Sequence, residues 1–461
     1  MAQITIAGAG LVGCLLGVVL ARRGHRVTIF ERRPDMRSAN ISAGRSINLA
    51  LSDRGLQALS IAGLAEELRA IAIPMSGRIM HDTSGSTHYQ PYGREGQAIN
   101  SVSRGELNKT LLTAAEQAGV EIVFSARCTD VHPATATATF ELENGDSRTV
   151  EADILFGADG AYSAVRERLM KTDRFDYSQS YLEHGYKELH IPPSADGGFL
   201  LDKHALHIWP RKSYMMIALP NIDGSFTCTL FFAHNGSPSF AELRSDADVQ
   251  SFFDQQFPDA AALMPTLLED FRTNPESSLV TIRCSPWTFA GRTALIGDAA
   301  HAIVPFYGQG MNCGFEDVRV LVDCLDVTGE DWPTALSLYE RYRKPAGNAI
   351  ADLAVENFKE MRDKVADERF LKRKSIEAWV YQNYPDRFVP LYTLVTFSPD
   401  VPYDEAQRIG REQDVIMEDL LDHPDVRADW TTDAAQSVIR KRIESLPTLN
   451  IRPLSPKNNL V

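Results

Sequence analysis

The sequence lacks an excess of basic residues, and this deficit argues against several classes of protein. Lysine and arginine together number 47 against 61 aspartate and glutamate residues, which gives a formal net charge of −14. Nucleic-acid binding requires a basic face for phosphate contacts, so a general role of that kind is disfavoured. The same deficit argues against a simple electrostatic anchor on anionic lipid. A local basic site for one phosphate or carboxylate remains compatible with this composition.

Cysteine is scarce, and its spacing fits no metal or disulfide pattern. The six cysteines form no CxxC pair and have no close histidine at zinc spacing. They stand at positions Cys14, Cys128, Cys228, Cys284, Cys313 and Cys324. Scattered cysteines in a long chain are typical of reduced, mostly buried thiols in a cytosol. We therefore expect no metal site and a cytoplasmic protein.

A single long hydrophobic run, ITIAGAGLVGCLLGVVLA at residues 4–21, has about the length of a membrane span. It lacks the basic segment that precedes a signal-peptide core. Its regular glycines instead indicate a buried strand, a turn and a helix. The C-terminal sequence TLNIRPLSPKNNLV is polar and contains prolines, so we expect no tail anchor. At 461 residues, the chain has room for two or three domains, or for one domain with large insertions.

Glycines mark the first nucleotide motif. Strand-like residues 3–7 lead into GAGLVG, then a helical run, and then a second strand that ends at Glu31. This is the βαβ arrangement of a dinucleotide-binding fingerprint. Gly8 permits the tight turn, Gly10 lets backbone amides approach a pyrophosphate, and Gly13 lets helix and strand pack closely. Glu31 is placed to accept hydrogen bonds from a ribose, although the motif alone does not separate NAD from FAD.

Two further strand ends carry a glycine beside an acid. In GADGAYSAVR, at 157–166, we expect Asp159 to cap the turn and Arg166 to pair with Asp159 or with a phosphate. The sequence ALIGDAAHAIVPFYGQGMN, at 294–312, places Asp298 after another apolar run. A single dehydrogenase domain does not need three such junctions. They favour a protein that wraps one extended dinucleotide, flavin included.

Two arginines support the same interpretation. Arg45 and Arg104 each stand just outside an apolar run, as if directed at a ligand rather than at the core. The usual alternative for a single arginine is a solvated or salt-bridged surface residue. The other nucleotide signals in the chain favour the ligand contact for both.

With these motifs in order, the chain resembles a known family. GAGLVG, SxxRxxL, GADGAYSAVR and LIGDAAHAIVPFYGQGMN are similar to the motifs of single-component, FAD-dependent aromatic hydroxylases. Further segments resemble the kynurenine 3-monooxygenase branch of that family and spread over nearly the whole chain, from Gln3 to about Ser398. These segments are GRSINLALSDRG, HGYKEL, LHIWPRKSYMMIALPN, SFTCTLFF and PLYTLVTFS. The first set fixes only the class, whereas the second set is much more specific.

The resemblance implies an α/β fold. Its parts are a Rossmann-like FAD-binding domain of the aromatic hydroxylase type, an interposed antiparallel-sheet substrate domain and a C-terminal helical region. We expect residues 1–175 and 280–350 to form a discontinuous FAD-binding domain, with 72–100 contributing to the substrate site. Residues 176–279 then form the substrate domain and residues 351–461 the helical region. Strand-like runs separated by turn residues within the middle segment agree with this division.

The resemblance also implies the cofactors and the reaction. FAD is the bound cofactor and NADPH a transient co-substrate, and L-kynurenine and dioxygen give 3-hydroxykynurenine through a flavin hydroperoxide, a step in tryptophan degradation. Since the cofactor carries the hard chemistry, no catalytic side chain is required, and His301 is expected to be structural rather than a general base. The residues implied in cofactor binding are Gly8, Gly10, Val12, Gly13, Glu31, Arg32, Arg45, Arg104, Cys128, Asp159, Asp298, Gly310, Met311 and Asn312.

Substrate binding is implied for four polar residues that match the family's carboxylate site. They are Arg78 in GRIMH, Tyr92 in PYG, Asn357 in ENFKEM and Tyr392 in PLYTLVTFS. A guanidinium suits bidentate binding of a carboxylate. Without the resemblance, a surface arginine, core tyrosines and a helix-face asparagine would be the better interpretations. Phe232 and Met361 are candidates for the ring pocket and equally for apolar core.

The chain departs from the family at Tyr307, where many members have Phe or His. We expect this residue to tune the site rather than to be required for activity. Two alternatives stay open: a hydroxylase for another small aromatic acid, and a flavin-binding protein that acts on a protein partner. NADPH is expected near Arg104 and Arg166. Monomer and dimer are both compatible with the sequence.

Overall fold

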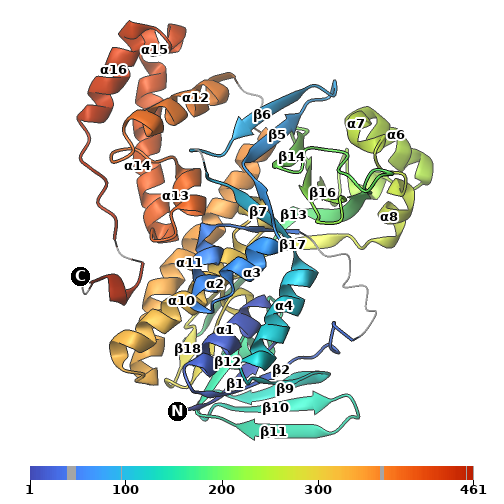
Figure 1. The fold of residues 1–461 in the computed structure, drawn as a ribbon, viewed down its shortest axis with the longest axis vertical. Coiled ribbons are helices and arrows are strands. Elements are labelled where there is room, and N and C mark those ends of the chain that lie inside the picture. Colours follow the sequence, from blue (N-terminus) through green and yellow to red (C-terminus); the bar gives the residue numbers. More distant parts are fainter. Residues whose placement is uncertain (39–47, 95, 364–367, 453, 460–461) are drawn as a thin grey trace.

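The computed structural model describes residues 1–38, 48–94, 96–363, 368–452 and 454–459 (Figure 1). Arg45 lies outside these residues, and so does the side chain of Met361. Figure 1 shows the N-terminal nucleotide-binding part at one end of the long axis and the C-terminal helices at the other, with the substrate sheet and its helices to one side.

A six-stranded sheet forms the centre of the nucleotide-binding part. Its strands, in spatial order, are β18 (Thr288–Phe289), β19 (Thr293–Leu295), β12 (Ile154–Gly157), β1 (Gln3–Ala7), β2 (Arg26–Phe30) and β8 (Glu121–Val123). All neighbours pair in parallel except β18 with β19. The apolar character of β1 and of α1 (Leu11–Arg22) follows from burial of this layer on both faces. The run at residues 4–21 is therefore a strand, a turn and a buried helix.

A seven-stranded sheet carries the substrate-domain core. Its order is β17 (Ser277–Ser285), β13 (Asp176–Ile191), β16 (Phe226–Ala233), β15 (Met215–Pro220), β14 (Ala205–Pro210), β5 (Gly77–His81) and β6 (Thr87–Pro91). Neighbouring strands are antiparallel except β14 and β5. Phe232 is fully buried in the aromatic core of this domain, where it packs against Phe240 and Phe252. Of the two interpretations of Phe232, ring pocket or apolar core, the structure supports the apolar core.

Short elements complete these two parts. Two three-stranded sheets consist of β3 (Asn48–Leu51), β7 (Ile99–Ser103) and β4 (Ile73–Met75), and of β11 (Ser147–Glu151), β10 (Thr137–Leu142) and β9 (Ala126–His132). The helices are α2 (Asp53–Ile61), α3 (Ala65–Ala70), α4 (Arg104–Gln117), α5 (Ala164–Leu169), α6 (Asp246–Gln256), α7 (Pro258–Ala261) and α8 (Leu267–Thr273), with the 3-10 turn η1 (Phe240–Glu242). The chain leaves the six-stranded sheet after β2 and enters the seven-stranded sheet at β5, early in its length.

The remaining chain is helical. It comprises α9 (Asp298–His301), η2 (Pro305–Tyr307), α10 (Gly310–Thr328), α11 (Trp332–Asp363), α12 (Glu368–Asn383), α13 (Leu391–Phe397), α14 (Tyr403–Asp422), α15 (Pro424–Asp429), α16 (Asp433–Glu444) and η3 (Pro456–Asn459). The helix α11 runs 32 residues from the nucleotide part into the C-terminal bundle, so position 350 falls inside it. None of the described helices combines the length and apolar composition needed to cross a bilayer.

Candidate active site

The loop between β1 and α1 is built on close backbone approach. Gly8 has a φ of +103°, and a Cβ there would lie 2.5 Å from the carbonyl oxygen of Ala158. A Cβ on Gly13 would lie 2.1 Å from the carbonyl oxygen of Gly8. A Cβ on Gly10 would meet open space, and α1 starts without a side-chain cap or an acid in its first turn. The first amides of this helix are therefore available to an anion.

Glu31 closes one side of the glycine loop. Its carboxylate is 6% exposed and accepts hydrogen bonds from the Ala9 amide at 2.8 Å and from Arg33 Nε at 2.8 Å. Burial opposes its charge, but the hydrogen bonds from Arg33 and Ala9 hold the pKa of Glu31 below its usual value. It is therefore an ionised acceptor beside the loop. Arg32 next to it is exposed, as is Arg104 at the start of α4.

Asp159 follows β12 and caps the next helix. Its Oδ2 accepts hydrogen bonds from the amides of Ala164 at 2.7 Å and Val165 at 3.3 Å, whereas its buried Oδ1 has no partner among the described residues. The cap that the sequence predicted is present, and one acceptor oxygen is left over for a ligand. Burial raises the pKa of the half-buried Cys128 thiol to about 12, with a further contribution from Asp159, so this thiol is neutral.

Arg166, on α5, contacts backbone carbonyls. Its side chain is buried, and it donates hydrogen bonds to the carbonyl oxygens of Ala299 at 2.8 Å and Ala161 at 2.5 Å. The bond to Ala299 ties α5 to α9, the helix that begins at Asp298. Among the described residues Arg166 does not pair with Asp159, because its Nη1 and Nη2 donate to these two carbonyls, whereas its buried Nε has no partner. A contact of Arg166 with a phosphate stays a prediction.

The Gly297-Asp298 junction packs directly on α1. Gly297 has a φ of +62°, and a Cβ there would lie 3.1 Å from Val12 Cγ2. A Cβ on Gly314 of α10 would lie 2.6 Å from the same atom. Val12 thus joins the first glycine loop to the late one, nearly three hundred residues apart in sequence. Asp298 itself is exposed, which leaves its carboxylate open to a ligand.

The N-terminus of α10 directs its first amides to the same region. These are the amides of Gly310, Met311 and Asn312, which precede the first intrahelical bond, from the Cys313 amide to the Gln309 carbonyl. No side chain among the described residues caps the helix. The Asn312 side chain is already used, because it accepts from the Ser52 amide and donates to the carbonyls of Ala50 and Gly308. Any ligand contact of Asn312 is therefore through its main chain.

These observations fit an extended dinucleotide. The structure supplies an open glycine loop at one helix N-terminus, an unpartnered buried oxygen at Asp159, an exposed Asp298 and a second uncapped helix. Val12 brings the early and late segments together. FAD fits this set of features, since its phosphates favour the N-terminus of α1 and its ring favours the N-terminus of α10.

Arg78 is the centre of a separate cluster on β5. The ring of Tyr92, just after β6, lies 5.3 Å from its Cζ, and the ring of Tyr392, on α13, lies 4.9 Å from it. The two tyrosine rings are nearly parallel, with centroids 5.5 Å apart. Tyr307, in η2, stacks on Tyr392 at 5.6 Å. The structure thus brings together four of the residues that the sequence proposed for this region.

The cluster is arranged to receive an anion. No carboxylate among the described residues lies within ion-pair distance of Arg78, and the buried Tyr92 hydroxyl has no hydrogen-bond partner there. Burial opposes the charge of Arg78, but Tyr392, Tyr92 and Glu360 hold its pKa above the usual value. Burial raises the pKa of Tyr92 and of Tyr307 well above the usual value, so both remain hydroxyl donors. A carboxylate would satisfy the guanidinium and a hydroxyl together.

Asn357, on α11, contacts the turn that carries Tyr307, and its direct contact with substrate stays a prediction. Its Nδ2 donates a hydrogen bond to the carbonyl oxygen of Phe306 at 2.7 Å, and Phe306 stacks on Phe358 at 4.2 Å. These contacts fix η2 against α11 and therefore place Tyr307. The sequence proposed a direct substrate contact for Asn357, and the structure shows a contact with the loop that carries Tyr307.

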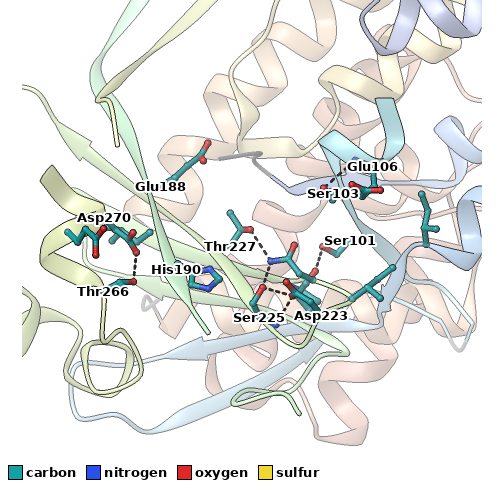
Figure 2. Close-up of a pocket in the computed structure, with 16 residues that line it drawn as sticks. Ser101, Ser103, Glu106, Glu188, His190, Asp223, Ser225, Thr227, Thr266 and Asp270 are labelled. Atoms are coloured by element: carbon teal, nitrogen blue, oxygen red, sulfur yellow. Dashed lines mark hydrogen bonds between the residues drawn. The ribbon is translucent and has the colours of Figure 1, made fainter. Parts of the chain in front are cut away.

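A cleft of about 850 Å³ lies elsewhere, between the two parts of the protein (Figure 2). Figure 2 shows side chains from β7 and α4 on one side of it and from β13 and α8 on the other. Its acids are Glu106, Glu188, Asp223, Glu269 and Asp270, and none of the described residues that line it is lysine or arginine. Repulsion from these carboxylates disfavours a phosphate-bearing ligand such as NADPH in this cleft.

A buried charged network, which was not predicted from the sequence, lies under the site. Arg343 donates to Asp317 Oδ1 at 2.7 Å and also pairs with Glu316, which in turn pairs with Arg54 at 2.6 Å. Asp317 Oδ2 lies 2.6 Å from His301 Nε2. Burial opposes the imidazolium, but the carboxylate of Asp317 holds the pKa of His301 well above its usual value. His301 is thus held in a buried ion pair, in agreement with a structural role.

Comparisons with known proteins agree with this geometry. A model of the FAD-binding domain family matches residues 1–354. Kynurenine 3-monooxygenase from Flavobacterium psychrophilum is 48% identical over 96% of this chain and 99% of its own. The enzyme of the same name from Myxococcus xanthus is 49% identical over 95% of each chain.

A solved structure shares the fold. The tetrameric form of 2-methyl-3-hydroxypyridine-5-carboxylic acid oxygenase aligns with a TM-score of 0.65, at 21% identity, over 84% of this chain and 98% of its own. This likeness confirms the predicted fold class, in which an FAD-binding domain of the aromatic hydroxylase type accompanies an antiparallel sheet and C-terminal helices. The chain therefore belongs to the FAD-binding monooxygenases of this fold, and within them to the kynurenine 3-monooxygenase family.

Proposed function

We propose that this chain hydroxylates L-kynurenine to 3-hydroxykynurenine with NADPH and dioxygen, as a flavoprotein monooxygenase. The observation that carries the proposal is Arg78, a guanidinium without a carboxylate partner among the described residues, placed beside Tyr92 and Tyr392. This arrangement suits the α-carboxylate of an aromatic amino acid. Relatives that bear the kynurenine 3-monooxygenase name match over nearly their full length.

In this function, the side chains bind the substrate, orient it and exclude water from it. Arg78 pairs with the substrate carboxylate, and the hydroxyl groups of Tyr92 and Tyr392 donate to it. Their stacked rings, with that of Tyr307, form an apolar wall that keeps water from the aromatic ring of the substrate. Asn357 holds the Tyr307 turn in place through Phe306.

The glycine loop of residues 8–13, the acids Glu31, Asp159 and Asp298, and the first amides of α10 would hold FAD. Arg32, Arg45, Arg104 and Cys128 complete the proposed set. When bound, FAD would supply the redox chemistry, including the activation of dioxygen. The amides at the start of α10 stabilise negative charge beside them. The proposed domain boundaries are those expected above: 1–175 with 280–350, 176–279 and 351–461.

The proposed compartment is the cytoplasm. It is supported by the six cysteines, which are all unpaired thiols, five of them buried. Such thiols are stable where the surroundings are reducing.

The test is substrate-dependent NADPH oxidation by the purified yellow protein. We expect L-kynurenine to stimulate NADPH oxidation and mass spectrometry to identify 3-hydroxykynurenine. NADPH oxidation with kynurenine could instead release only hydrogen peroxide, while another aromatic acid gives a hydroxylated product. That result would show that the other acid, and not kynurenine, is the substrate. Absence of flavin reduction with every small molecule tried would contradict the enzymatic proposal altogether.

A further inference from the structure

Arg54 stands in the segment ALSDRG, at the start of α2, and is 1% exposed. Its Nη1 donates to Glu316 Oε2 at 2.6 Å. The rest of its guanidinium points at backbone carbonyls: Nε donates to Val395 at 2.6 Å, and Nη2 donates to Leu394 at 3.0 Å and Val401 at 2.6 Å. The proposed function gives no direct role to this residue.

These carbonyls belong to the end of α13 and to the turn that follows it. The helix α13 has only seven residues, which is too short to be stable without tertiary contacts. The last four carbonyls of any helix lack intrahelical partners. Arg54 satisfies two of them and places a positive charge at the negative end of the helix dipole. The ring of Tyr403, the first residue of α14, covers the guanidinium at 4.0 Å.

Tyr392 lies on the same short helix, one turn before the carbonyl of Val395. Its ring stands between those of Tyr92 and Tyr307 and lies 4.9 Å from the Arg78 guanidinium. Because α13 is short, a shift of its C-terminal end moves the whole helix. The position of Tyr392 therefore depends on the hydrogen bonds that hold this end to α2.

We propose that Arg54 is a positioning residue for the carboxylate site: it fixes α13 and so holds the Tyr392 hydroxyl beside Arg78. This inference rests on the proposed function, since it concerns the binding of the same substrate. Arg54 does not contact substrate or cofactor in this role. Its planar fork serves three carbonyls and one carboxylate at once, which the single ammonium group of a lysine does not reproduce.

The test is a double-mutant cycle on L-kynurenine affinity, read from the change in flavin absorbance of the FAD-loaded enzyme. Arg54→Lys is expected to weaken binding about tenfold, the equivalent of one lost hydrogen bond to a charged group. Tyr392→Phe removes only the hydroxyl. If Arg54 acts through that hydroxyl, the double variant binds within about twofold of Tyr392→Phe alone. Independent losses that multiply in the double variant would overturn the proposal.

A matched control is Arg319→Lys. Arg319 is also buried at this junction, but it donates to the Pro399 carbonyl at 3.1 Å and to Asp400 Oδ1 at 2.7 Å, and none of its hydrogen bonds reaches α13. We expect L-kynurenine affinity within about twofold of wild type for this variant. An equal loss in Arg319→Lys would show that general loosening, rather than α13, governs binding, and would overturn the proposal.

A second variant keeps the test decisive if Arg54→Lys does not retain FAD. Tyr403→Leu removes the ring that covers the guanidinium, together with the hydroxyl that donates to Gln309 Oε1 at 2.9 Å, and leaves the four hydrogen-bond partners of Arg54 in place. The same cycle with Tyr392→Phe is expected to be non-additive, and an additive result overturns the positioning role. A wild-type enzyme that does not respond to L-kynurenine contradicts the proposed function, whereas an additive cycle in a responsive enzyme contradicts only this inference.

Discussion

Asp317→Asn is the substitution that most directly perturbs the buried network below the proposed flavin loop. The Asp317 side chain is fully buried and lies 2.6 Å from His301 Nε2. It also accepts from Arg343 Nε at 2.7 Å and from the Gly297 amide at 3.0 Å. Asparagine keeps the shape but removes the charge, so His301 and Arg343 lose their common counter-ion.

The magnitude follows from the burial of this ion pair. Removing one partner of a buried pair costs about 3–5 kcal/mol, because the other charge is left uncompensated. The entropy of unfolding is about 2.1 cal/mol/K per residue, and for a chain of 461 residues the total is roughly 1 kcal/mol/K. For cooperative unfolding, the Tm of the FAD-loaded variant should therefore fall by about 3–5 °C.

The pH dependence has a definite sign. The pKa of His301 is raised in the folded state by Asp317, so its stabilisation is fully present below the unfolded value near 6.5 and declines as pH rises above it. Burial opposes the charge of Asp317, but His301 and Arg343 lower its pKa, so that its contribution is lost only in acid. The gap in Tm between wild type and variant should be larger at about pH 5.5 than at about pH 9.

The assay is thermal unfolding followed by circular dichroism at both pH values. Asp352→Asn is the matched control, since Asp352 pairs with Arg283 at 2.6 Å but its side chain is 45% exposed. A surface pair contributes about 1 kcal/mol or less, so that Tm should fall by no more than about 1 °C. Equal losses for the two variants, or a gap that does not change with pH, would refute the account of a buried charged network.

Three further outcomes concern the sites themselves. Arg78→Met should raise the KM for L-kynurenine roughly ten- to a hundredfold through loss of a charge-assisted contact, and steady-state kinetics with unchanged KM would remove Arg78 from the site. Gly13→Ala should abolish FAD retention, because its Cβ would lie 2.1 Å from the Gly8 carbonyl oxygen. Gly17→Ala on the same helix meets the tip of the Ile29 side chain and should keep the cofactor, and the flavin absorbance of the two purified proteins compares them. Tyr307→Phe should still form the hydroxylated product, as detected by its mass. Complete loss of that product would show that the phenol is required for activity and does not merely tune it.

Glycine-based parts of the site could be predicted because backbone geometry leaves few alternatives. At Gly8 and Gly13 a side chain would overlap backbone atoms, so the residue type itself reports the close approach. The fold class followed from the same motifs and from the family resemblance. Arg78, Tyr92 and Tyr392 were found only through that resemblance, since three residues so far apart in sequence carry no local signal of contact.

The buried charged residues could not be predicted in this way. The sequence does not distinguish buried charged residues such as Arg54, Glu316 and Arg343 from solvated ones on the surface. Only the tertiary structure shows that these three residues are 0–1% exposed. The burial of Arg166 was not predicted for the same reason, because one of its two carbonyl partners, Ala299, comes from another segment. An acidic pair flanked by apolar residues, such as Glu316-Asp317 between Phe315 and Val318 in α10, is the signal that could have indicated them.

The decisive measurement for the proposed hydroxylation is the mass of the product formed from L-kynurenine, NADPH and isotopically labelled dioxygen. We expect the wild-type enzyme to form 3-hydroxykynurenine that carries one labelled oxygen atom. At the same substrate concentration, below the wild-type KM, we expect much less of this product from Arg78→Met. Unlabelled product, or oxidation of NADPH that yields only labelled hydrogen peroxide, would contradict the proposed hydroxylation.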